Sequence, residues 1–160
     1  MGNERKKMTI IVFSNDMDKA MAAFILATGA ASAVMDVTLF FTFWGLSLLR
    51  KEAHEPLKKT LVEKMFGWML PKGPSGSTLS KMNFGGAGTS MMKGVMRSKK
   101  MPQLGELMDM AASMNVKLIA CSTSMGIMGI TKEELLDDIE VGGVATYLGE
   151  ATDSNVNLFI

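Results

Sequence analysis

The segment from Ala20 to Leu49 constrains the fold most strongly, because Asp36 is its only charged side chain. A stretch of this length and hydropathy is long enough to cross a bilayer. Its first part, however, is rich in small residues, and the part after Asp36 is β-branched and aromatic. A membrane helix would also place an aspartate near the middle of the bilayer, which is costly. We therefore favour a buried helix followed by a buried strand of a parallel sheet over a membrane-spanning helix.

The rest of the chain alternates between short apolar runs and amphipathic stretches, and its 160 residues suit one domain. Strands are predicted over residues 8–13, 37–43, 116–120, 140–143 and 156–160. Helices are predicted over 17–32, 56–70, 102–114 and 144–154, with a short one over 46–51 after the strand breaker Trp44-Gly45, and a capping box at 131–134 starts another. This alternation predicts an α/β domain with a mostly parallel sheet and helices on both sides.

Residues 71–100 differ in composition from the rest of the chain, because they are rich in glycine and methionine and poor in aliphatic side chains. We expect a long functional loop or a mobile insertion here. The run Asn83 to Thr89 is interpreted either as a hinge or as a backbone cradle for an anion, although it matches neither the dinucleotide-binding nor the Walker pattern. The methionines suit an adaptable contact surface or, alternatively, a copper(I) site.

Charge and cysteine content exclude several classes of function. Lys and Arg (17) nearly balance Asp and Glu (16), and no basic stretch alternates with aromatics, so we do not expect nucleic-acid binding. The apolar run from Met8 to Phe13 is too short for a signal peptide and is better explained as the first strand. A single cysteine forms no internal disulfide, which suits a reducing, cytoplasmic setting.

That cysteine, Cys121, follows the predicted strand 116–120 and precedes Ser122, Thr123 and Ser124. Sites in parallel sheets form at the carboxyl ends of strands, where helix N-terminal N–H groups lower a thiol pKa. We therefore expect Cys121 to be the reactive atom, with a buried packing cysteine as the alternative. The only histidine, His54, is far away in sequence, so the fold would have to create any Cys/His pair. We expect no metal and no cofactor.

Several spaced motifs carry a resemblance to a known family. They are KLIACSTSMGIMGI (117–130), EVGGVATYLGEA (140–151), FTFWGLSLL (41–49), the terminal NLFI and the loop MNFGGAGTSMMKGVM. Together they resemble the DsrE/DsrF-like sulfurtransferase superfamily, and most closely its DsrE2-type branch. The resemblance implies a five-stranded three-layer α/β/α fold, homo-oligomers, and a cysteine at the position of Cys121 that carries sulfur as a persulfide. An acidic residue often stands in that family where this chain has Gly126.

The function that this resemblance implies is a sulfur carrier or sulfurtransferase that relays sulfane sulfur between protein thiols. Its donor and acceptor are expected to be rhodanese-like or TusA-like proteins. The alternative is a non-catalytic interaction or ligand-binding subunit whose cysteine is structural. The expected supporting residues, as donors to the sulfur or as parts of a loop that closes over it, are Ser122, Thr123, Ser124, Gly85, Gly86 and Gly88. Membrane association is not favoured.

Overall fold

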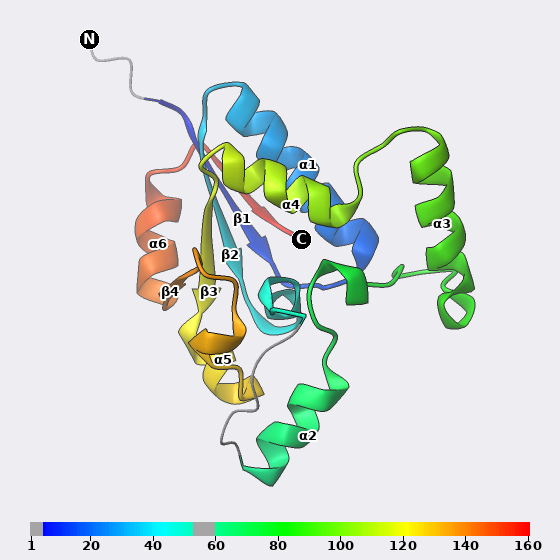
Figure 1. Ribbon diagram of the computed structural model, residues 1–160. Helices are drawn as coiled ribbons and strands as arrows, with labels where there is room; N and C mark the ends of the chain where they lie inside the picture. The colour runs from blue at the N-terminus through cyan, green and yellow to red at the C-terminus, as the bar shows by residue number, and fades with distance from the viewer. Residues whose placement is uncertain (1–4, 53–59) are drawn as a thin grey trace.

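The computed structural model describes residues 5–52 and 60–160, and its centre is a five-stranded sheet in the order β4-β3-β2-β1-β5 (Figure 1). All neighbouring strands are parallel. The strands are β1 (Lys7–Val12), β2 (Asp36–Phe41), β3 (Lys117–Cys121), β4 (Glu140–Gly142) and β5 (Val156–Phe159). The predicted α/β architecture with a mostly parallel sheet of about five strands is therefore confirmed.

Alternate side chains of the central strands point to opposite faces of the sheet. One set belongs to the main hydrophobic core and comprises Ile10, Val12, Leu39, Phe41 and Ala120. The other set forms a smaller cluster of Phe40, Ile119 and Cys121 on the opposite face. Every residue of β2 after Asp36 is buried, which explains why this strand is a continuous apolar run and not an alternating one.

Helices α1 (Met17–Ser32) and α4 (Leu104–Ser113) pack against each other over the main core (Figure 1). The buried positions of α1 recur at helical spacing, and several are alanines that allow α4 to come close. On α4, Leu107 and Ala111 belong to the same core. The predicted bounds of the first helix agree with α1.

The opposite face of the sheet is covered by α6 (Val144–Thr152), which leads from β4 to β5 and lies on the other side from α1 and α4 (Figure 1). Its half-buried Tyr147 packs on the smaller cluster, with its ring centroid 5.1 Å from that of Phe40. No residue of α6 is fully buried. This face is therefore covered more thinly than the main core.

The segment Ala20 to Leu49 forms most of α1, then β2, then a 3-10 helix, η1 (Phe43–Leu49). This agrees with the buried helix and strand that we favoured. Within the described residues, no helix combines the length and the apolar character needed to cross a bilayer.

The strand β2 ends at Phe41, before the predicted Phe43, because the chain turns sharply into η1. Gly45 makes this turn possible, since a Cβ atom at that position would lie 2.1 Å from the Val12 carbonyl oxygen. Its N–H donates to the Phe13 carbonyl at 2.9 Å. The predicted break at Trp44-Gly45 is confirmed, whereas the short helix begins three residues earlier than predicted.

The region from residue 60 to 100 differs most from the prediction. Helix α2 (Leu61–Met69) begins later than the predicted helix, whose start at Pro56 lies outside the described residues. The second half of the expected loop is a helix, α3 (Ala87–Ser98), preceded by the short 3-10 helices η2 (Pro74–Gly76) and η3 (Phe84–Gly86). The glycine-rich sequence of α3 has a low helix propensity and does not predict a helix. The helix is stabilised by the burial of Thr89 and Met96.

An ion pair between Arg50 and Glu134 is buried next to η1, with 3.1 Å between Nη2 and Oε1 and each side chain 1% exposed. The guanidinium also donates to the carbonyls of Gly67 and Leu70, so it joins the end of α2 to the 3-10 helix η4 (Lys132–Glu134). The other Glu134 oxygen accepts the Thr131 N–H. The predicted capping box is thereby confirmed, although the helix it starts is one short 3-10 turn.

We expect Glu134→Gln to reduce the free energy of unfolding by about 3–5 kcal/mol, because it leaves the buried Arg50 charge without its counterion. The measurement is chemical denaturation at neutral pH. The matched control is Asp137→Asn, which breaks the exposed Lys51–Asp137 pair in the same region and should cost less than about 1 kcal/mol. Equal effects of the two substitutions would contradict the structural importance of the buried pair.

Candidate functional site

The carboxyl ends of the parallel strands gather at one edge of the sheet. At this edge β2 is followed by Thr42, β3 ends at Cys121, and β4 ends at Gly142, which pairs with Cys121. Helix α5 (Ser122–Met128) starts directly after β3. Polar groups from two neighbouring strand ends and one helix start therefore meet around the thiol.

Cys121 is both the last residue of β3 and the N-cap residue of α5. Its side chain is 4% exposed and points to the α6 side of the sheet, where it packs with Phe40, Ile119 and Tyr147. It does not belong to the main core between the sheet and α1. The thiol thus lies beneath one half-buried tyrosine at the more thinly covered face.

A small group of hydrogen-bond donors surrounds the sulfur. The hydroxyls of Thr42 and Ser124 are hydrogen-bonded to each other at 2.7 Å. Burial raises the pKa of the Cys121 thiol, but the nearby Ser124 hydroxyl and N–H, Thr42 hydroxyl and Thr123 N–H lower it by more. The net pKa is lower than that of an ordinary cysteine, which increases the thiolate population at neutral pH.

The three hydroxyl residues after Cys121 have different environments. Ser124 is buried and acts on the sulfur through its hydroxyl and its N–H, whereas Thr123 acts through its N–H. Ser122 is exposed, and its hydroxyl lies near Gly143 at the start of α6. The structure therefore brings Ser124 and Thr123 to the thiol and gives Ser122 no hydrogen bond to it.

Gly85, Gly86 and Gly88 are not brought to Cys121. They precede or begin α3, which lies on the opposite side of the molecule from α5 (Figure 1). Gly85 and Gly86 have φ values of +66° and +102°, so they supply a left-handed turn into the helix. Instead of closing over the thiol, this segment is attached to the start of α1 by hydrogen bonds from the Ser80 N–H and hydroxyl to Asp18.

Sequence reasoning missed Thr42 and Tyr147. Thr42 reaches the thiol because β2 and β3 are neighbours, with Phe41 paired to Ala120. The polar residue at the end of the VTLFF strand was a usable signal, but the pairing order of the strands was needed to interpret it. His54 lies outside the described residues. Across 5–52 and 60–160, no three His, Cys, Asp or Glu side chains are grouped so that they could hold a metal ion.

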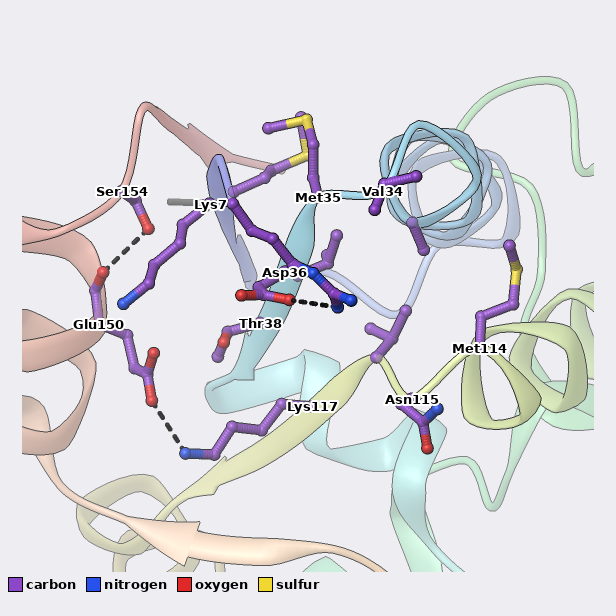
Figure 2. Close-up of a pocket in the computed structure, with 15 residues that line it drawn as sticks. Lys7, Val34, Met35, Asp36, Thr38, Met114, Asn115, Lys117, Glu150 and Ser154 are labelled. Atoms are coloured by element: carbon purple, nitrogen blue, oxygen red, sulfur yellow. Dashed lines mark hydrogen bonds and ion pairs between the residues drawn. The ribbon is translucent and has the colours of Figure 1, made fainter. Parts of the chain in front are cut away.

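A pocket of about 410 Å³ lies at the other end of the strands and is lined by Lys7, Asp36, Lys117 and Glu150, among others (Figure 2). Two of its ion pairs lie within the pocket, and Lys7 lies 4.0 Å from Asp153, which is not part of the lining. Lys117 lies 2.8 Å from Glu150, and Arg5 lies 3.6 Å from Asp36. This arrangement is explained as ion pairing at the amino ends of β1, β2 and β3, whereas Cys121 lies at the carboxyl end of β3.

Because the pKa of Cys121 is lowered, its alkylation by iodoacetamide should rise with pH with a midpoint below that of an ordinary cysteine in an unfolded peptide. In Ser124→Ala the midpoint should move upward, since the substitution removes the Ser124 hydroxyl, one of the groups that lower the pKa of Cys121. Ser122→Ala is the matched control and should leave the midpoint unchanged. The readout is the rate of mass gain against pH, and identical midpoints in all three proteins would contradict the assigned effect of Ser124 on the thiol pKa.

Known proteins match this chain over nearly its whole length. The model of the DsrE/DsrF/DrsH-like family matches residues 4–159. The chain is 50% identical over its full length and the full length of the relative to "Uncharacterized protein YrkE" of Bacillus subtilis. It is 34% identical to "Sulfur carrier protein DsrE2" of Allochromatium vinosum, over 98% of this chain and 99% of the relative.

A solved structure shares the fold: the ychN protein from E. coli, with a TM-score of 0.56 and 12% identity, aligned over 97% of this chain and 99% of that one. The assignment to a family rests on the family model, which matches nearly the whole chain, and on the relative that is 34% identical. The chain belongs to the DsrE/DsrF/DrsH-like family.

Proposed function

We propose that this protein relays sulfane sulfur between protein thiols and that Cys121 carries the sulfur as a persulfide. The family supports a role in sulfur relay, and one relative is named a sulfur carrier protein. The single observation that carries the proposal is the lowered pKa of Cys121 within its group of hydroxyl and N–H donors. Those donors favour the nucleophilic thiolate despite its burial.

The first step is an exchange at sulfur. The Cys121 thiolate attacks the outer sulfur of a donor persulfide, so that a bond forms between Sγ and that sulfur. The donor's own S–S bond breaks, and the donor thiolate leaves with the electron pair. In the second step an acceptor thiolate attacks the outer sulfur and Cys121 leaves as a thiolate. No net oxidation occurs, and no separate general acid or base is required.

Thr42 and Ser124 would serve in both steps, because Cys121 is a thiolate before the first step and again after the second. Their hydroxyls and the N–H groups of Thr123 and Ser124 stabilise that charge. Tyr147 and Phe40 cover the thiol, so a partner protein has to gain access past the α6 side. Rhodanese-like or TusA-like proteins are the partners that we propose, in a reducing compartment.

Incubation with polysulfide, or with thiosulfate and a rhodanese, should add one or more sulfur atoms to the intact mass of the protein. Cys121→Ala should gain none, and the added sulfur should be released by a reductant. Tyr147→Ala should load faster than the unsubstituted protein because it uncovers the thiol, whereas Leu148→Ala, on the exposed side of the same helix, should not. Failure of the unsubstituted protein to load from any donor would instead support the non-catalytic subunit with a structural cysteine.

We also propose that a second copy of this chain packs against the β5 edge of the sheet, around Phe159, and leaves α6 free for sulfur-transfer partners. Leu158 packs against the main core, so the next residue, Phe159, points to the α6 side, where it is 66% exposed. Its ring and that of Phe43 both contact Phe13, and Phe43 is itself exposed. A second copy would remove this apolar surface from water.

The native mass should therefore be at least twice 17.3 kDa in size-exclusion chromatography with light scattering. Phe159→Asp should lower that mass toward the monomer, because it places a charge in the contact. The control is Phe84→Asp, which changes a residue that is 76% exposed in η3, away from this surface. A monomeric native protein would contradict the proposal.

A further inference from the structure

Positive charge is concentrated in one part of a nearly neutral chain. The whole chain has a net charge of +1, yet residues 71–105 contain no aspartate or glutamate. The basic residues in that range are Lys72, Lys81, Lys93, Arg97, Lys99 and Lys100. A segment with cations and no anions attracts negatively charged ligands.

Within this segment a pocket of about 310 Å³ lies between η2 and α3. On the α3 side its lining includes Gly86, Ser90, Lys93 and Arg97, whose spacing of four, three and four residues places them along one face of the helix. On the η2 side the lining comprises Ser75, Ser77 and Thr78. The walls therefore combine hydroxyl groups with two cations.

Ser77 is the most informative residue of this pocket. It is 1% exposed, and its Oγ has no hydrogen-bond partner among the residues that the structure describes. A buried hydroxyl without a partner is unfavourable, and native proteins rarely keep one without a reason. A ligand oxygen in the pocket would supply the missing partner.

The two cations are available to a ligand as well. In residues 5–52 and 60–160, no carboxylate forms an ion pair with Lys93 or Arg97. The Lys93 ammonium lies 3.3 Å from the Ser75 carbonyl oxygen, which positions it at the pocket. A guanidinium such as that of Arg97 binds two oxygens of an oxyanion at once.

Two neighbouring groups are already occupied and set the limits of the site. The Ser75 hydroxyl donates to the exposed Glu52 carboxylate, which does not line the pocket. The Thr89 hydroxyl donates to Asn83 and accepts from the Leu79 N–H, so it holds the wall in place. The groups left for a ligand are the hydroxyls of Ser77, Thr78 and Ser90 and the side chains of Lys93 and Arg97.

We propose that this pocket binds a small tetrahedral oxyanion, with Lys93 and Arg97 neutralising its charge and the Ser77 hydroxyl donating to one of its oxygens. This site lies on α3, apart from the Cys121 site on α5, and does not depend on the proposed sulfur relay. Phosphate, sulfate and thiosulfate share the required chemistry.

The test is calorimetric titration of the full chain with each of these three anions at constant ionic strength, with chloride as the reference anion. Saturable binding with a Kd in the millimolar range or tighter is expected for at least one of them. The order of their affinities identifies which of the three anions the pocket prefers. Arg97→Gln and Lys93→Gln should each weaken binding at least tenfold. Lys99→Gln removes a charge from the C-terminal end of the same helix, outside the pocket, and should leave binding unchanged.

Ser77→Ala separates binding from stability. It should weaken anion binding several-fold without lowering the Tm of the anion-free protein, because the hydroxyl that it removes has no partner there. Absence of saturable binding would overturn the proposal. So would an equal loss of affinity in Lys99→Gln and Arg97→Gln, since that would reduce the effect to general attraction by a basic segment.

Discussion

The two-sided burial of β2 and β3 is the constraint on which the rest of this structure depends. Strands without a polar face need cover on both sides, and parallel pairing then requires long connections that cross the sheet. Those connections place α1 and α4 on one face and α6 on the other. The same geometry brings Thr42 and Cys121 to one edge, although they are far apart in sequence. The chemistry of the thiol is thus a consequence of how the apolar runs are buried.

The sequence predicts the regular elements well where the apolar pattern is strong. The first helix, the parallel sheet and the break at Gly45 could all be found, because each has a local signal: helical periodicity, a continuous apolar run and a residue without a side chain. Helix α3 could not be predicted from the sequence, because its glycines and serines disfavour a helix. Its stability comes from the buried contacts of Thr89 and Met96. Tertiary packing outweighs local preference there.

The candidate site was predictable only in its local part. Cys121, Thr123 and Ser124 are adjacent in sequence, so a strand that passes into a helix is enough to place them together. Thr42 depends on strand order, which a single sequence does not provide. Gly85, Gly86 and Gly88 are predicted near the thiol, because the sequence does not fix where a long loop lies. In the structure, Ser80, a few residues before them, donates two hydrogen bonds to Asp18 and thereby holds this part of the chain at the start of α1.

The cover over the thiol differs in strength from the rest of the fold. Local opening of a protein occurs first where few apolar side chains are buried. Helix α6 has no fully buried residue, whereas α1 and α4 each bury several in the main core. Detachment of α6 would consequently expose the sulfur while the sheet and its opposite layer remain intact. In the folded state the thiol is covered by α6, the helix that we expect to detach from the sheet at a lower cost in free energy than α1 or α4.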